Sequence, residues 1–471
     1  MQKPHSRPSR ARRCAVAVVI GALAAGAAIA QAQPVRSRKD GLSPDALFKA
    51  WTAERYDFGP PALVDHETVE SRLKKIAGDA AELFSLEEIG RSVEGRSINH
   101  LWFGRGRFHV LLWSQMHGDE ATATPALLQM AEYVGRHRAD APVRRLLEQL
   151  TVHMVPMLNP DGARRYQRRN AQGLDVNRDA LLLQSPEGRA LKALRDRLKP
   201  ALGFNLHNQN WRTSAGKTGK PASFSLLAVA FDEARTMTPG RVLTKKVCVV
   251  MRDALELFAP GQVARYDDEF EVRAFGDNIT LWGTPVVLLE TGPYAGARAD
   301  EDLVRLNFVS LMAALDAVAT GAVHAADPSR YEQLPVNESN LFAMLIRGAS
   351  IVTGTGIQPF TGDVGITVGR SIRERQSERE LVQVFRVEDL GDLRLFGALD
   401  VIEGAGLLVA PAWDRALEEG IEISVPDWTT VKAKVPLAPG TPANLVILRP
   451  LGDDRYLVER VIDAEKRLGG K

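Results

Sequence analysis

The sequence predicts an α/β fold with a mixed, largely parallel sheet flanked by helices, followed by a smaller, mainly β domain. Up to about residue 320, apolar runs of strand length alternate with longer segments whose apolar residues recur at helical spacing. Such alternation is typical of sheets with helices packed on their faces. Beyond residue 341, only short strand-like runs separated by Gly and Pro recur.

The elements follow one another in a regular order. Residues 40–75 read as helical and polar, and a turn-rich stretch over 89–98 leads into the first strands. The strands expected in the α/β part are 109–115, 152–158, 201–206, 223–230 and 285–289. The helices expected there are 121–137, 186–198, 241–258 and 302–319. Near residue 321 the alternation of strand-like and helical segments stops. We therefore divide the chain into a signal peptide (1–32), an α/β domain (40–320), a linker (321–340) and a β-sandwich-like accessory domain (341–471).

The first residues have the pattern of a secretory signal peptide. Residues 1–13 are rich in Arg, residues 14–30 are apolar, and Ala30-Gln31-Ala32 offers a small-residue cleavage site. We therefore expect a periplasmic or secreted bacterial protein without a stable membrane span after cleavage, and an uncleaved anchor is the alternative. After cleavage only Cys248 remains, so no internal disulfide can form.

Composition argues against nucleic acid as a partner. The 471 residues carry a formal net charge of +2, and 45% of them are hydrophobic. A nucleic-acid-binding surface needs a clustered excess of basic residues, which this chain lacks.

Three predicted strands each stop at a residue that can bind a metal or work beside one. These residues are His117 with Glu120, then His207, then Glu290. A lone His at a strand end is more often a hydrogen-bonded structural residue, but a Glu after four apolar residues is unusual because burying an unpaired carboxylate is costly. Because parallel strands end at the same sheet edge, the sequence predicts two imidazoles, one carboxylate ligand and one spare carboxylate together. That set suits a catalytic zinc ion with an open position.

The motifs around these residues resemble the zinc carboxypeptidase family, typified by carboxypeptidase A, over about residues 85–320. They occur in the family's order: GRSVEGRSI at 90–98, HGDE at 117–120, NPDG at 159–162, RRN at 168–170, LDVNRD at 174–179, NLH at 205–207 and LLETG at 288–292. The resemblance implies one zinc ion held by His117, Glu120 and His207. It implies that Glu290 is the general base and that Arg168 stabilises the oxyanion of the tetrahedral intermediate.

The resemblance also implies a peptide or amide substrate with a free carboxylate. Asn177 and Arg178 match the pair that grips this carboxylate, and a guanidinium fork suits its geometry. Arg273 is either a second anion contact or a surface salt bridge. The other arginines of the 163–180 segment, namely Arg164, Arg165 and Arg169, are expected in a solvated basic loop.

Two departures from the family pattern concern the substrate pocket. Asp119 stands between the predicted ligands, where the family often carries an arginine. If Asp277 aligns with the Asp of the family's specificity pocket, the position of its capping tyrosine falls near Glu269 or Phe270. Tyr266 is the candidate to replace that tyrosine, or the role is missing.

The C-terminal segment resembles the small β domain of amidohydrolases. Residues 345–352, 406–411 and 443–448 are similar to segments of that domain, but only about 30 residues separate the last two segments, and none is His. An amidohydrolase would place its metal-binding barrel there, so we expect a β domain without metal chemistry of its own.

Together these features predict a secreted zinc metallocarboxypeptidase that hydrolyses a C-terminal peptide bond. A zinc deacylase or cell-wall peptide amidase using the same centre is the alternative within enzymes. A binding module with a decayed zinc site is the alternative outside them.

Overall fold

The structure, a computed structural model, describes residues 41–375, 378–412 and 417–468. The predicted signal peptide (1–32) and its cleavage site lie outside the described residues, so they stay predictions.

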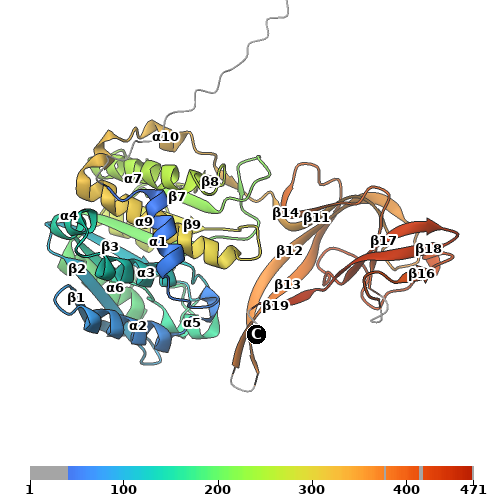
Figure 1. The fold of residues 1–471 in the computed structure, drawn as a ribbon, viewed down its shortest axis with the longest axis horizontal. Helices are drawn as coiled ribbons and strands as arrows, with labels where there is room; N and C mark the ends of the chain where they lie inside the picture. Colours follow the sequence, from blue (N-terminus) through green and yellow to red (C-terminus); the bar gives the residue numbers. More distant parts are fainter. Residues whose placement is uncertain (1–40, 376–377, 413–416, 469–471) are drawn as a thin grey trace, which may run out of the picture. The chain divides into compact units, whose positions relative to one another are not determined.

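The described α/β part is built on a mixed eight-stranded sheet with the strand order β1-β2-β4-β3-β5-β9-β7-β8 (Figure 1). Its four central strands, β4, β3, β5 and β9, run parallel, whereas β2 and β7 pair antiparallel to their central neighbours. The strands are β1 (Phe84–Arg91), β2 (Ser97–Gly104), β3 (Phe108–Ser114), β4 (Leu150–Val155), β5 (Leu202–Asn208), β7 (Phe224–Ala228), β8 (Val263–Arg265) and β9 (Val286–Thr291). The predicted α/β class is therefore confirmed.

Helices cover both faces of this sheet. The helices are α1 (Pro44–Glu54), α2 (His66–Asp79), α3 (Ala123–Arg136), α4 (Ala141–Gln149), α5 (Pro160–Arg165), α6 (Pro186–Leu198), α7 (Pro239–Glu256), α8 (Phe275–Leu281) and α9 (Ala299–Thr320). Leu111 and Trp113 of β3 pack with side chains of α6 and α8 in one core cluster. Successive strand residues face opposite sides, so Leu112 belongs to the other face, where α7 and α9 pack. The central strands are thus buried on both faces, as parallel strands usually are.

Helix α9 is the core helix of this layer. It contacts α1, α3, α4 and α7. Among the described residues it alone is long and apolar enough to cross a membrane by length and composition, but 78% of its most apolar window is buried in the fold. Its apolar character is therefore accounted for by packing.

Three helices of the α/β part, α4, α5 and α8, were not expected from the sequence, and α5 shows why. The strand predicted over 152–158 ends at Val155, and α5 begins at Pro160. The side chain of Asn159 accepts a hydrogen bond from the backbone N–H of Gly162, and Pro160 occupies the first helical position. Both features favour a helix start.

The segment 321–340, predicted to be a linker, packs against the α/β part. It contains η3 (Ala322–Ala325), α10 (Ser329–Glu332) and β10 (Asn337–Glu338), and β10 pairs with β6 (Ser214–Ala215). Tyr331 is buried, and its hydroxyl accepts a hydrogen bond from the backbone N–H of Ala228.

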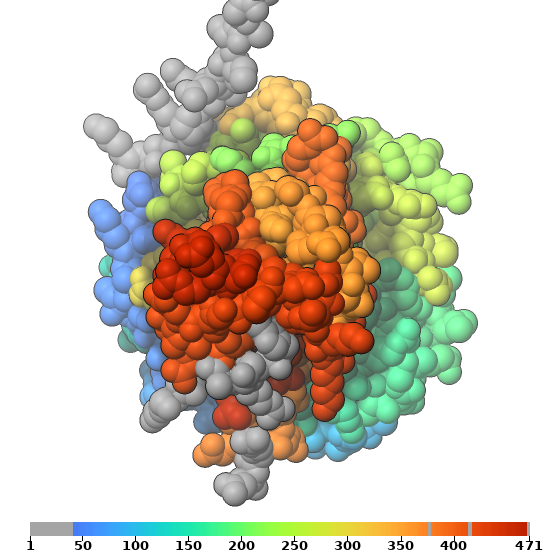
Figure 2. Space-filling model, turned by 90° about the vertical axis from the view of Figure 1, so that its right-hand side faces the viewer, coloured from blue at the N-terminus to red at the C-terminus, as the bar shows by residue number. Residues whose placement is uncertain are grey.

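The described C-terminal residues form a second, nine-stranded sheet. Eight strands follow the order β16-β18-β17-β15-β11-β12-β13-β19, and β14 also pairs with β11. The strands are β11 (Leu341–Ile351), β12 (Phe360–Arg375), β13 (Glu378–Gly391), β14 (Gly397–Glu403), β15 (Leu408–Pro411), β16 (Glu422–Ser424), β17 (Leu445–Gly452), β18 (Arg455–Ile462) and β19 (Glu465–Leu468). Three apolar clusters of buried residues lie among its strands, and Figure 2 shows one face of it in orange and red. Its resemblance to the amidohydrolase β domain stays a prediction.

We predict that Phe204→Ala destabilises the α/β part. Phe204 is fully buried on β5 between Leu112 of β3 and Val287 of β9. Removing its ring leaves a cavity and should lower the free energy of unfolding by about 3–5 kcal/mol in urea denaturation. Leu182→Ala, at a side chain that is 74% exposed, should change it by less than about 0.5 kcal/mol. Equal effects of the two variants would contradict this core assignment.

Candidate active site

The candidate site lies where three parallel strands end at one sheet edge. β3 pairs with β5 so that Ser114 is opposite Leu206, and β5 pairs with β9 so that His207 is opposite Glu290. Residues opposite each other in a sheet point to the same face. The register alone therefore brings Glu290 beside His207.

A sharp turn after β3 positions His117 and Glu120. Gln115 has a φ of 53°, in the left-handed region, so the strand ends there. The Gln115 amide donates to the carbonyl of Gly118 (3.0 Å) and accepts from the hydroxyl of Thr124 on α3 (2.7 Å). This non-glycine left-handed residue is held in place by its own side chain.

The NPDG motif supports this turn from the next strand end. Asn159 donates from its side chain to the carbonyl of Met116 (3.3 Å). A Cβ on Gly118 would lie 2.0 Å from the carbonyl carbon of Gly162, so only glycine allows the two backbones to approach this closely.

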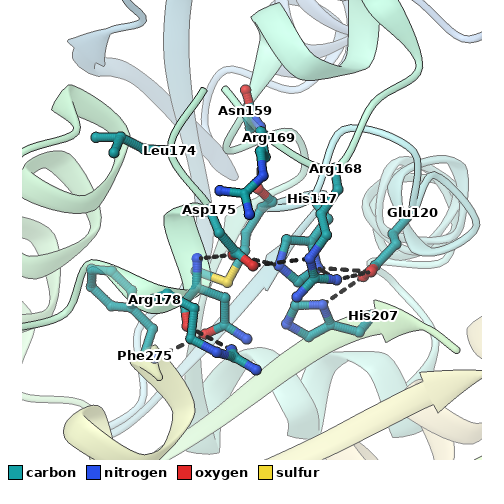
Figure 3. Close-up of polar contacts among 12 residues, drawn as sticks. His117, Glu120, Asn159, Arg168, Arg169, Leu174, Asp175, Arg178, His207 and Phe275 are labelled. Atoms are coloured by element: carbon teal, nitrogen blue, oxygen red, sulfur yellow. Dashed lines mark hydrogen bonds and ion pairs between the residues drawn. The ribbon is translucent and has the colours of Figure 1, made fainter. Parts of the chain in front are cut away.

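His117, Glu120 and His207 converge, as Figure 3 shows. Their ligand atoms all lie within 4.8 Å of one another. One oxygen of Glu120 is 2.7 Å from Nδ1 of His117, and the other is 2.6 Å from Nδ1 of His207. Both imidazoles are buried, and Glu120 is 9% exposed.

Asp175 completes the surroundings of His117. Its Oδ1 is 3.0 Å from Nε2 of His117, and its Oδ2 accepts from Nε of Arg168 at 2.9 Å. A carboxylate on the second nitrogen of a metal-binding imidazole fixes the ring and raises its basicity. No role was assigned to Asp175 from the sequence, although it lies in the LDVNRD motif, two residues before Asn177.

The electrostatics of this group favour a cation. Burial disfavours the charged form of His117, but the charge of Glu120 and the hydrogen bond to Asp175 outweigh it and raise its pKa to about 9. The charges of the two imidazoles hold the pKa of Glu120 far below its usual range, although burial opposes this. Two imidazoles, one ionised carboxylate and an outer carboxylate fit a zinc ion.

Glu290 lies beside this group and has an unusual environment for a carboxylate. It is buried, and among the described residues its Oε2 has no hydrogen-bond partner. Burial and the neighbouring charge of Glu120 raise the pKa of Glu290 well above its ordinary value. A buried carboxyl with a raised pKa is suited to accepting and returning a proton near neutral pH.

Arg168 reaches into the same group from the 163–180 loop. Its Nη1 lies 3.1 Å from Nδ1 of His117 and donates to Oε1 of Glu120 (3.3 Å). Its side chain is 43% exposed, so it is open to the cleft on one side and touches the ligand group on the other. Arg164 and Arg165, expected in a solvated loop, form exposed ion pairs with Glu374 and Glu94.

A cleft of about 480 Å³ contains the ligand group, Glu290, Arg168, Asn177 and Arg178. Asn177 accepts a hydrogen bond from the backbone N–H of Phe275 (2.9 Å). Arg178 forms an ion pair with Glu271 (3.1 Å). Arg273 does not line this cleft, and it pairs with the same Glu271.

The cleft lining includes an acidic wall, which contacts Arg178 through Glu271. Asp267, Glu269, Glu271 and Asp277 line it together with Tyr266. The charge of Glu290 and burial raise the pKa of Tyr266 to about 12, so the phenol stays neutral beside that carboxyl. Asp119, by contrast, lines a neighbouring hollow, and Phe270 lines neither.

Asn205 is a cleft residue to which the sequence reading assigned no role. It lies two residues before His207 on β5 and is buried, and its Oδ1 has no partner among the described residues. The two-residue period of a strand predicts that Asn205 and His207 share a face, so the signal was present in the NLH motif.

Comparisons with known proteins find similarity to carboxypeptidases. A family model described as zinc carboxypeptidase matches residues 69–223. Carboxypeptidase M of Mus musculus is 30% identical over 130 residues, covering 24% of this chain and 29% of the relative. Carboxypeptidase E of Caenorhabditis elegans is 33% identical over 132 residues, covering 24% and 28%. The chain thus spans less than a third of each relative's length.

A solved metallo-carboxypeptidase from Burkholderia cenocepacia aligns with a TM-score of 0.44 at 21% identity, covering 54% of this chain and 69% of that one. The family match confirms the resemblance read from the motifs. It includes all residues proposed above to bind metal, whereas Glu290 and Arg273 lie beyond it.

We predict that Gly118→Ala weakens zinc binding. The added Cβ would collide with the backbone at Gly162 and displace the turn that carries His117 and Glu120. Zinc affinity, measured by competition with a chelator, should fall about 10- to 100-fold. Gly78→Ala on α2, where no described atom lies within 4 Å of the new Cβ, should leave it unchanged. Wild-type affinity in Gly118→Ala would contradict the assigned turn.

We predict that Asp277→Asn stabilises the protein increasingly as pH rises. Burial raises the pKa of Asp277 from 3.8 to about 7. Between these values the unfolded chain releases this proton while the folded one keeps it, so wild-type stability falls as pH rises. Asn cannot ionise, so its gain should grow from less than about 1 kcal/mol at pH 4 to about 4 kcal/mol at pH 8.

Thermal unfolding at several pH values tests this, with Asp57→Asn at an exposed site as the control. A gain that is constant between pH 4 and pH 8 would show that ionisation of Asp277 is not responsible.

Proposed function

We propose that this chain, whose residues 69–223 match the zinc carboxypeptidase family, is a zinc metallocarboxypeptidase that hydrolyses a C-terminal peptide bond. One observation carries the proposal. The register of β5 and β9 places Glu290 beside His207, which itself converges with His117 and Glu120. A catalytic zinc site needs this combination of three ligands and an adjacent unpaired carboxyl.

His117, Glu120 and His207 would hold one zinc ion. When bound, zinc supplies Lewis acidity that polarises a carbonyl and lowers the pKa of water toward about 7. Asp175 orients His117 through its hydrogen bond at Nε2, so the Nδ1 lone pair faces the shared centre.

Glu290 acts as the general base in this proposal. Its buried carboxylate accepts the proton of the attacking water and then delivers it to the nitrogen of the leaving amine. A carboxyl with a raised pKa can perform both transfers, because neither protonation state is strongly preferred near neutral pH.

Arg168 donates hydrogen bonds to the oxyanion that forms on the substrate carbonyl. Its Nη1 contacts Oε1 of Glu120 in the structure, and it would turn from that oxygen toward the substrate carbonyl once zinc occupies the ligand atoms. Asn177 and Arg178 line the same cleft and bind the substrate's terminal carboxylate.

The alternative enzyme is a zinc deacylase or cell-wall peptide amidase with the same centre. The acidic wall next to Arg178 is the observation that keeps it open, because carboxylates there disfavour an added anion. Peptides ending in L- or D-residues and N-acyl amino acids, compared under mass-spectrometric readout, separate the two activities.

We predict that Glu290→Gln retains zinc and loses activity. Glutamine has the same shape but cannot accept the proton, so kcat should fall about 10²- to 10⁴-fold on the best peptide substrate. Zinc content by elemental analysis should stay at the wild-type level, and Glu88→Gln, at the edge strand β1, should keep full activity. Undiminished kcat in Glu290→Gln would refute the assigned mechanism.

A further inference from the structure

Arg178, assigned to the substrate carboxylate, is already paired with a carboxylate of this chain. Its Nε lies 3.1 Å from Oε2 of Glu271, and its Nη1 donates to the carbonyl of Asn177 at 2.9 Å. The side chains of Arg178 and Glu271 are 34% and 32% exposed, and both line the cleft. A substrate anion entering the cleft therefore meets an arginine that has an internal partner.

Glu271 has a second cation that can hold it without Arg178. Nε of Arg273 donates to its Oε1 (3.1 Å) and Nη2 donates to its Oε2 (3.2 Å), a bidentate arrangement. The hydrogen bond from Arg273 keeps the pKa of Glu271 below its ordinary value, so the carboxylate is charged at neutral pH. Two guanidinium groups thus share one carboxylate, which leaves charge for a second anion.

The backbone around Glu271 is anchored, so an exchange would involve side chains alone. Its N–H donates to Oδ1 of Asp277 (3.0 Å), and its carbonyl accepts from the N–H of Ala274 (2.9 Å). The following residue, Phe275, is tied to Asn177 through its own N–H. Rotation about the side-chain bonds of Glu271 would therefore leave these backbone hydrogen bonds intact.

We propose that Glu271 is a specificity-determining residue that competes with the substrate carboxylate for Arg178 and shifts onto Arg273 alone when substrate binds. The inference rests on the proposed function, because it takes Arg178 as the carboxylate-binding group. If only a fraction of the Arg178 side chains is free of Glu271, the apparent affinity for the substrate carboxylate equals the intrinsic affinity multiplied by that fraction. A half-exposed ion pair is weak, so this factor should be about two- to fivefold.

The competition affects binding and leaves the chemical step unchanged. After the exchange, Arg178 contacts the substrate carboxylate in the same way in both ground state and transition state. Loss of such uniform binding changes KM and leaves kcat unaltered. A substrate with an amidated C-terminus cannot displace Glu271, so its affinity should not depend on this residue.

The test measures KM and kcat of the zinc-loaded enzyme. The substrate is the peptide with a blocked N-terminus and a free C-terminus that wild type cleaves fastest. Glu271→Gln should lower KM about two- to fivefold at constant kcat, because Gln carries no charge to compete. Arg273→Gln should raise KM, because Glu271 then has Arg178 as its remaining cation. In the double variant, the effect of Arg273→Gln should disappear, as expected for coupled residues. Glu459→Gln, in an exposed pair with Arg449 on β17 and β18, is the matched control.

A binding measurement separates failure of this inference from failure of the proposed function. Calorimetry with the zinc-loaded Glu290→Gln protein, which does not turn the peptide over, measures the Kd of the same peptide with a free or an amidated C-terminus. Tighter binding of the free-carboxylate peptide after adding Glu271→Gln supports the inference even if no peptide is cleaved by wild type. Cleavage by wild type with an unchanged or raised KM in Glu271→Gln overturns it and assigns Glu271 to holding Arg178 in place. The inference is also overturned if the free and the amidated peptide bind with equal affinity, both to Glu290→Gln and to the Glu271→Gln, Glu290→Gln double variant.

Discussion

The carboxylate of Glu120 is the centre on which the rest of the structure depends. Each of its oxygens faces one imidazole, and Oε2 also accepts the backbone N–H of Asn208 at 3.1 Å. Burying an ionised carboxylate to this extent costs free energy unless its charge is compensated and its oxygens accept hydrogen bonds. The turn after β3 and the end of β5 must therefore meet at one point, and the parallel register of the central strands provides that meeting.

The motifs outside the site keep this meeting point rigid. Asp161 of NPDG is fully buried and accepts hydrogen bonds from the hydroxyl of Ser92 (2.8 Å) and from Arg96 (2.7 Å). These residues belong to the GRSVEGRS stretch before β2, so two distant motifs form one network. That network fixes the start of α5, whose Gly162 lies against Gly118. Reactive groups are held best when their supporting residues are themselves locked by hydrogen bonds and packing.

The charged residues of the cleft form two groups. His117, His207 and Arg168 surround the carboxylate of Glu120, whereas Arg178 is paired with Glu271 of the acidic wall. In the proposed function, substrate recognition would depend on how strongly each arginine is held by carboxylates of the chain, and Glu271 connects Arg178 with the exposed Arg273. Because exposed ion pairs are worth little, the proposal implies that small changes in this wall alter substrate preference without disturbing His117, Glu120 and His207.

Much of the fold and of the ligand set can be predicted from the sequence. Apolar runs and helical periodicity are local patterns of the sequence, and they indicate which faces will be buried without knowledge of the chain path. The positions of β3, β5, β9, α6 and α9 follow from it within a few residues. The helix at Pro160 was missed because its capping by Asn159 competes with an apolar run that reads as a strand.

The sequence by itself determined the residue types at each strand end, including His117, Glu120, His207 and Glu290. Only the tertiary structure decided that β5 lies between β3 and β9, which sets Glu290 opposite His207. It also decided that Asp175 holds His117 and that Glu271 is shared by Arg178 and Arg273. Strand order and long-range side-chain pairs depend on how loops return the chain to the sheet, and neither periodicity nor composition encodes that path.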